Sequence, residues 1–214
     1  MNQSIYKLSF YRRTPRALNL APGDLVPLLA KREDAGQRFG RKTLLTAKMG
    51  WSNERYEYFL VELFPGLDAI RDYNACLEEL RWFEIVSSET YLGIPMDEQC
   101  IDMEPLVPPA GARKPVYRVF LSRPSPLSYG LPPEEHEEML RRTQEAAQVA
   151  GSKPVLSAYT RWNNEEWEYF GVEQFASAED ALRYTQYLSV SSWYRYTISR
   201  SFLGDLVEGL LFNP

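Results

Sequence analysis

The chain has 214 residues, of which 44% are hydrophobic, 14% aromatic and 25% charged, a composition typical of a globular protein with one large core or two small ones. The net charge of −5 argues against a nucleic-acid partner, which requires a basic surface. The N-terminus has no signal-peptide pattern and the apolar runs are too short to span a membrane, so we expect a cytoplasmic protein with Cys76 and Cys100 reduced.

The first 93 residues contain six predicted elements in the order strand, helix, strand, strand, helix, strand. The predicted strands are 6–11, 43–51, 56–64 and 85–92, and the predicted helices are 24–35 and 67–81. A turn at 52–55 joins the second and third strands into a hairpin. This βαββαβ order predicts a four-stranded antiparallel sheet with both helices on one face.

A proline-rich segment follows at 94–115. It contains five prolines and one glycine, a density that prevents a continuous helix or a central strand, so we interpret the segment as a connector. We expect it to lie against the protein surface because it carries four apolar residues, Ile101, Met103, Leu106 and Val107.

The remaining residues, 116–214, repeat the first 93. When the sequence is aligned with itself at an offset of 111 positions, Trp51 coincides with Trp162, and 27 of the 88 residues from Tyr6 to Gly93 are identical to their counterparts. Average residue usage would give about five identities by chance. We therefore predict three parts: a βαββαβ unit at 1–93, the connector at 94–115 and a second βαββαβ unit at 116–214.

The third strand of each unit predicts that the two sheets cover each other. Side chains alternate along a strand, and both faces of this strand are largely apolar. One face packs on the helices, and the other would be an exposed aromatic patch unless something covered it. The same face of the other unit is the simplest cover. The predicted fold class is therefore α+β, with two antiparallel sheets packed face to face within one chain.

A duplicated βαββαβ unit resembles the dimeric α+β barrel superfamily, in which two ferredoxin-like sheets close into a barrel. The resemblance covers nearly the whole chain and implies a pseudo-dimeric α+β barrel made of two tandem ferredoxin-like units. Superfamily members include cofactor-free monooxygenases, polyketide cyclases, isomerases, ligand-binding regulators and haem proteins related to chlorite dismutase. A shorter run is similar to darcynin-like proteins, which imply no known activity: LFPGLD at 63–68, followed by Tyr73, Leu77, Leu80, Arg81, Trp82 and Phe83.

We expect neither a haem cofactor nor a metal. Haem bound through histidine requires an axial imidazole, and the only histidine, His136, lies among four glutamates in the first turns of a predicted surface helix. A solvated helix residue is the simpler interpretation, and the counterpart of His136 in the first unit is Leu25. Zinc would lack Cys and His ligands, and a Ser-His-Asp or Cys-His site would have to use the same histidine.

Glu62 and Glu173 are the candidate catalytic residues. They occupy equivalent places in the two third strands, on the face that carries Tyr58 or Tyr169. If this face lines the barrel, desolvation in an aromatic cavity raises the carboxyl pKa toward that of a general base. The alternative, which we favour, is that each glutamate pairs with an arginine at the barrel rim.

Aromatic residues around these strands are the candidate ligand contacts. A Trp-x-Asn-Glu turn occurs in both units, and a structural role, in which asparagine tolerates a left-handed backbone, is our main interpretation. The other interpretation is that its tryptophan closes the barrel mouth over an apolar ligand. Gly171 stands where the first unit has Leu60 and is expected to leave room for a ligand. The predicted ligand contacts are Trp51, Tyr56, Tyr58, Trp162, Trp167, Tyr169 and Gly171.

Two functions of different classes remain open. The first is an enzyme without a tightly bound cofactor, such as a monooxygenase or cyclase, which encloses an apolar, aromatic or polyketide-like small molecule in the barrel. The second is a non-catalytic ligand-binding or assembly protein. A cavity between the sheets that holds Glu173 or Tyr169 would favour the first, and a filled barrel would favour the second. The acidic charge argues against RNA binding by an aromatic sheet face, and a homo-oligomer stays open.

Overall fold

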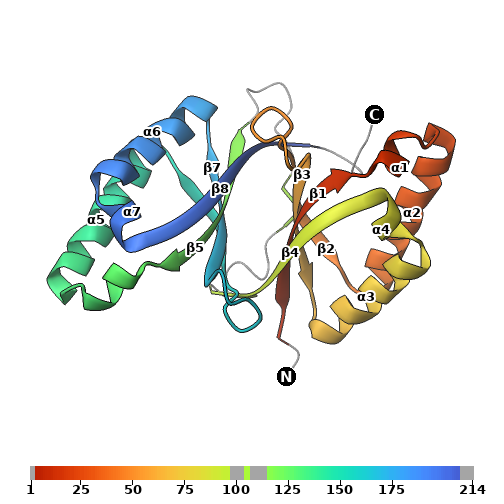
Figure 1. Cartoon of the computed structure of the whole chain (residues 1–214), viewed down its shortest axis with the longest axis horizontal. Coiled ribbons are helices and arrows are strands. Elements are labelled where there is room, and N and C mark those ends of the chain that lie inside the picture. Colours follow the sequence, from red (N-terminus) through yellow and green to blue (C-terminus); the bar gives the residue numbers. More distant parts are fainter. Residues whose placement is uncertain (1–2, 97–103, 107–114, 208–214) are drawn as a thin grey trace.

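The computed structural model describes residues 3–96, 104–106 and 115–207, and it forms one closed antiparallel barrel. The strands follow the order β1-β3-β2-β8-β5-β7-β6-β4 around the barrel. Figure 1 shows the helices of the first half on one side of the strands and those of the second half on the other. The barrel therefore lies between two layers of helices, one from each half.

The first half has the predicted order of elements with two short helices added. Its elements are β1 (Ile5–Arg13), α1 (Pro15–Leu18), α2 (Pro22–Arg38), β2 (Lys42–Lys48), β3 (Tyr58–Phe64), α3 (Leu67–Glu79), α4 (Trp82–Ile85) and β4 (Val86–Pro95). The helix predicted to reach residue 81 ends at Glu79, because Arg81 has a left-handed backbone with φ of 57°. Ser192 occupies the matching position in the second half, with φ of 66°.

The second half repeats this plan. Its elements are β5 (Val116–Pro124), the 3-10 helix η2 (Pro126–Gly130), α5 (Pro133–Val149), β6 (Lys153–Tyr159), β7 (Tyr169–Phe175), α6 (Ala178–Val190), α7 (Trp193–Tyr196) and β8 (Thr197–Leu206). Within the residues that the structure describes, none of the helices combines the length and the apolar character needed to cross a bilayer.

The Trp-x-Asn-Glu turn differs from its predicted backbone. The strands on either side stop at Lys48 and begin again at Tyr58, so the turn is longer than residues 52–55. The Asn53 side-chain oxygen accepts hydrogen bonds from the backbone N–H groups of Arg55 and Tyr56, both at 2.8 Å. In the described chain the only non-glycine residues with positive φ are Arg81 and Ser192, so asparagine acts here through its side chain and not through a left-handed backbone.

Two seams close the barrel within one chain, as predicted. At one seam Ala47 of β2 pairs with Leu206 of β8, and at the other Ala158 of β6 pairs with Pro95 of β4. Gly93 and Gly204 occupy equivalent places on β4 and β8. A Cβ at Gly93 would lie 2.6 Å from both the Ala158 Cβ and a Phe170 ring carbon, so the sheets approach too closely for a side chain there.

The connector contacts the barrel at residues 104–106, the described stretch in the middle of the connector. The backbone N–H of Leu106 donates to the carbonyl oxygen of Leu44 at 2.9 Å, and the Leu106 side chain packs on the barrel core. This contact confirms that the connector lies against the protein surface at Leu106. Cys100, Ile101, Met103 and Val107 lie outside the described residues.

The barrel interior is filled by side chains from both halves. Strands β1, β3, β5 and β7 point eleven buried residues into it: Tyr6, Leu8, Phe10, Phe59, Val61, Leu63, Tyr117, Val119, Leu121, Phe170 and Val172. Phe10 and Phe202, from different halves, lie with ring centroids 4.9 Å apart. Close packing of this kind supports the shared core of the two sheets.

Candidate functional site

The candidate catalytic residues face the helices and not the barrel. Tyr58 and Leu60 belong to the core between the first sheet and its helices, which we call the first helix-side core. Phe59, Val61 and Leu63 are the members of β3 that face the barrel. By the same alternation Tyr169, Gly171 and Glu173 face α5 and α6. The condition for a catalytic role of Glu62 and Glu173, that their strand face lines the barrel, is therefore not met, because the opposite strand face supplies the barrel lining.

Glu62 lies at the centre of a buried cluster of charges under α2. One of its carboxylate oxygens accepts from Arg32 at 2.7 Å and from Arg41 at 3.0 Å, and Lys7 lies 3.8 Å from the other. Burial alone would raise the carboxyl pKa, but the three cations outweigh it and the pKa of Glu62 is lowered. Glu62 is therefore a paired anion and has the opposite pKa shift from the one a general base requires.

Glu173 has one ion-pair partner among the described residues, where Glu62 has three. Its carboxylate accepts from Arg118 at 2.6 Å, and its side chain is 13% exposed. Arg118 is the counterpart of Lys7, whereas Thr143 and Ser152 stand where the first half has Arg32 and Arg41. Pairing with an arginine was the favoured alternative for both glutamates, and the structure confirms the pairing but places it beneath the helices and not at the rim.

The space that Gly171 was expected to leave open is occupied. A Cβ at Gly171 would lie 2.5 Å from the Phe120 ring and 3.0 Å from the Leu156 carbonyl oxygen. Phe120 is the strand partner of Gly171, and the matched partners in the first half are Ser9 and Leu60. A large and a small residue have thus exchanged strands between the halves, which conserves the filled volume.

Two of the predicted ligand contacts, Tyr56 and Trp167, do face the barrel interior. Tyr56 donates a hydrogen bond to Glu89, and so does Tyr91. Arg200 donates to the same carboxylate at 3.1 Å from the opposite side of the barrel. Desolvation alone would raise the pKa of Glu89. The two tyrosine hydrogen bonds and the charge of Arg200 together lower it by more, so the pKa of Glu89 is lowered overall.

The sequence contained a signal for this cluster that our prediction did not use. Glu89 and Arg200 are separated by 111 positions, so the acid of one half coincides with the base of the other. A residue and its own counterpart meet only near the axis that relates the two halves. An opposite-charge pair at the repeat offset therefore marks that axis.

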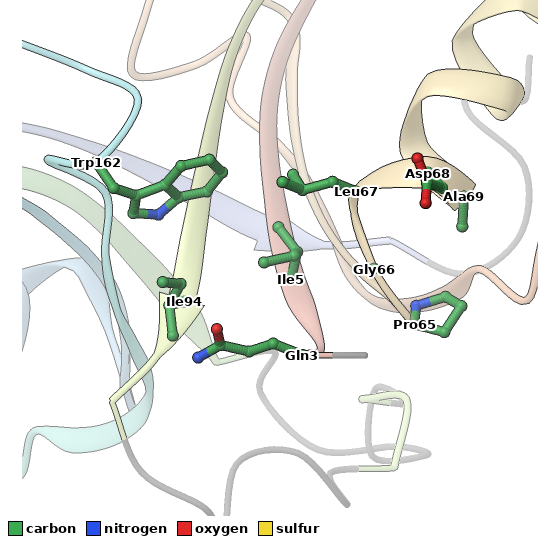
Figure 2. A pocket seen from close by; sticks show the side chains of 9 residues that line it. All are labelled: Gln3, Ile5, Pro65, Gly66, Leu67, Asp68, Ala69, Ile94 and Trp162. Carbon is green, nitrogen blue, oxygen red and sulfur yellow. The ribbon is translucent and has the colours of Figure 1, made fainter. Parts of the chain in front are cut away.

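A pocket with both apolar and polar lining lies outside the barrel, where the hairpin of the second half meets the first half. Its volume is about 470 Å³. The Trp162 ring and the Leu67 side chain point toward one another across it, with Ile5 and Ile94 alongside (Figure 2). The lining residues, which we call the Trp162 pocket, are Gln3, Ile5, Pro65, Gly66, Leu67, Asp68, Ala69, Ile94 and Trp162.

Both retained tryptophans thus lie in hairpin loops, and Trp162 packs beside residues of the first half. The two hairpin loops project above and below the central strands in Figure 1, in orange for the first half and teal for the second. Ser52 beside Trp51 donates to the Leu203 carbonyl oxygen of the other half, so each hairpin tip lies against the half to which it does not belong. This contact between halves gives the turn a structural reason to be retained.

Known proteins share the fold of this chain but not its sequence. No protein-family model and no curated protein matches it. A mutant chlorite dismutase from Candidatus Nitrospira defluvii superposes with a TM-score of 0.76 at 10% identity, over 97% of this chain and 93% of that one. The imidazole complex of that organism's chlorite dismutase gives 0.76 at 9% identity, over 97% and 93%. A candidate chlorite dismutase gives 0.72 at 15% identity, over 96% and 95%.

The fold class is therefore an α+β barrel of two ferredoxin-like halves. More particularly, it is the chlorite dismutase fold, carried here by a sequence of low identity to those proteins. The similarity to darcynin-like proteins gains no support from the comparisons.

Haem is the cofactor that the superfamily suggests, and the side chains of this chain do not fit a histidine-ligated haem. His136 is the only histidine in the sequence, and it is exposed in the first turns of α5. No imidazole therefore lies in the barrel or in either helix-side core. Among the described residues, no group of three or more His, Cys, Asp and Glu side chains could hold a metal ion. We assign no step to a cofactor.

Proposed function

We propose that the protein is a non-catalytic binding protein that takes a small apolar or aromatic molecule in the Trp162 pocket. The pocket itself is the observation that carries the proposal. Its volume of about 470 Å³ falls within the usual range for small-molecule sites. Leu67 and Trp162 are 49% and 38% exposed although both are large and apolar, and a ligand between them would remove their surfaces from water.

The ionisable group in this pocket supports binding and not catalysis. Asp68 is the one ionisable side chain among the lining residues. It is 86% exposed and lies 3.0 Å from Arg71, one helical turn away. A solvated, paired carboxylate is not the enclosed group that general acid or base catalysis needs. Cofactor-independent monooxygenase or cyclase chemistry would therefore have no enclosed acid or base at this site.

The second half offers a matched location without the same apolar walls. Trp51 is the counterpart of Trp162, and it is 51% exposed. Around it, Ala178 and Asp205 stand where the Trp162 pocket has Leu67 and Ile94. A carboxylate in place of an isoleucine disfavours an apolar ligand. The two tryptophans occupy matched positions, but only Trp162 has a leucine and an isoleucine at the neighbouring positions.

The test is a fluorescence titration with the uncharged apolar probe N-phenyl-1-naphthylamine. We expect saturable binding, and Trp162→Ala should weaken it by about tenfold or more, the effect of losing a central aromatic contact. Trp51→Ala is the matched control and should leave the Kd within about twofold, since its surroundings lack the apolar walls. Equal losses in the two variants, or no saturable binding by the wild type, would contradict the proposal.

A further inference from the structure

The pseudo-symmetry axis of the barrel carries an asymmetric set of polar residues. In the first half the set is Tyr56, Glu89 and Tyr91, and the matched residues in the second half are Trp167, Arg200 and Phe202. Strands β4 and β8 stand on opposite sides of the barrel, so Glu89 and Arg200 meet across its interior. All three positions differ between the halves, although the surrounding strands carry many identities.

The first-half members satisfy one another. Tyr56 and Tyr91 are buried and both donate to the Glu89 carboxylate, whose side chain is 25% exposed. The carboxylate also lies 3.3 Å from Arg55, which is 66% exposed. The Glu89 carboxylate thus accepts from two hydroxyl groups, and Arg200 adds a third donor and a positive charge from the barrel side.

The second-half residues Trp167, Arg200 and Phe202 suit an acidic partner and not a basic one. Phe202 has no hydroxyl, and the Arg200 guanidinium lies over its ring at 4.8 Å from the centroid. Trp167 is only 6% exposed, and its indole N–H has no hydrogen-bond partner among the residues that the structure describes. Tyr56, the counterpart of Trp167, donates to Glu89. The counterpart of Glu89 is Arg200, which is itself a donor and cannot accept a hydrogen bond from Trp167. The unpaired N–H is the expected result of replacing an acceptor by a donor.

We propose that Glu89 and Arg200 make the barrel face of the N-terminal half specific for the C-terminal half and unfit for a second copy of itself. Two N-terminal halves would bring two Glu89 carboxylates together at the axis. Two C-terminal halves would bring two Arg200 guanidinium groups together. Like charges brought together at the axis, where the Glu89 and Arg200 side chains are 25% and 29% exposed, repel one another, whereas the mixed pair is neutral. The partner that this surface fits is the other half, whatever ligand the Trp162 pocket binds.

Single substitutions in the full chain reproduce each mismatched pairing at the axis. Arg200→Glu creates the acid–acid contact of two N-terminal halves, and Glu89→Arg creates the base–base contact of two C-terminal halves. Each should lower the folding equilibrium constant, measured by urea unfolding, by about tenfold or more. The double variant E89R/R200E restores opposite charges and should recover most of that loss. Failure of the double variant to exceed both single variants would overturn the proposal.

Two further variants keep the test decisive if a single variant fails to fold. Neutral Glu89→Gln and Arg200→Gln remove one charge each and should cost less than the like-charge variants. The triple variant Trp167→Tyr, Arg200→Glu, Phe202→Tyr places the first-half set on both sides of the axis. It supplies hydroxyl donors to both acids, so only charge repulsion remains, and it should stay about tenfold or more less stable than the wild type. Wild-type stability in this variant would show that the axis accepts two acids and would overturn the proposal.

Discussion

The two helix-side layers of this molecule are built on one backbone plan but are filled differently. The first helix-side core contains fourteen buried residues, and the corresponding cluster in the second half contains six. At matched positions Ile70 becomes Ala181 and Tyr11 becomes Ser122. The barrel, by contrast, is shared by both halves and holds large side chains from each. The fold therefore depends on the sheet-to-sheet core, while each helix layer is free to diverge.

The charges beneath the helices diverge in the same way. Glu62 is surrounded by Lys7, Arg32 and Arg41, all buried, whereas Glu173 has only Arg118 among its ion pairs in the described residues. Burial of several charges is favourable only as a complete network, since removal of one member leaves the others uncompensated. The two glutamates look equivalent in the sequence but have different energetic roles.

The largest expected effect separates these two glutamates. Glu62→Gln should lower the free energy of unfolding by about 3 to 5 kcal/mol, because three buried cations lose their common anion. Glu173→Gln should cost about 1 to 3 kcal/mol, the range for one buried polar group left without its partner. Urea unfolding of both variants measures the difference, and equal losses would contradict the comparison.

Glu62→Gln should also differ from the wild type in its response to acid. The folded-state pKa of Glu62 is lowered, so its contribution to stability is complete above the ordinary value of 4.5 and is lost as the pH falls below it. The wild type should therefore lose stability steeply on the acid side, and Glu62→Gln should lose less. An unchanged pH profile in that variant would show that Glu62 is not the titrating group.

An exchange of volume between the halves gives the next largest effect. Gly171→Leu installs the residue of the first half, and it should cost about 1 to 3 kcal/mol because the new side chain meets the Phe120 ring. The double variant with Phe120→Ser restores the Ser9 and Leu60 combination and should regain most of the loss. Thermal unfolding of the single and double variants checks this, and a double variant less stable than the single would rule out compensation.

Substitutions in the two hairpin turns should have equal effects on stability, because the halves do not differ there. Asn53→Ala and Asn164→Ala each remove one side-chain acceptor that serves two backbone N–H groups. Each should lower the free energy of unfolding by about 1 kcal/mol, the net value of such a hydrogen bond. A large difference between the two variants would mean that the turns are not equivalent.

The smallest expected effect concerns the residue that only the second half has. His136→Ala should leave stability and ligand binding unchanged, because His136 is exposed in the first turns of α5. Haem added to the wild type should give no stoichiometric complex with a Soret band, for want of an enclosed imidazole. A stoichiometric haem complex that His136→Ala abolishes would overturn this expectation.

Periodicity and repetition were enough to predict the fold of this chain. The offset of 111 made the two halves visible, and the two-sided apolar pattern of the third strand predicted that the sheets cover each other. The same pattern could not show which strand face looks inward, because Tyr58 and Phe59 are both suited to burial. That one ambiguity left open whether Glu62 and Glu173 lie in the barrel or beneath the helices. The Trp162 pocket could not be predicted either, since it joins a hairpin of one half to a loop of the other.

The closed barrel also sets a condition on how the chain is made. In the finished protein β2 and β4 lie at the seams, where each is covered by a strand of the second half. While the ribosome is still producing the second half, both strand edges and the aromatic barrel face of the first half have no cover. At ordinary rates of synthesis that interval lasts on the order of ten seconds. During it the nascent chain is open to pairing with neighbouring copies, so the first half needs protection until its partner emerges.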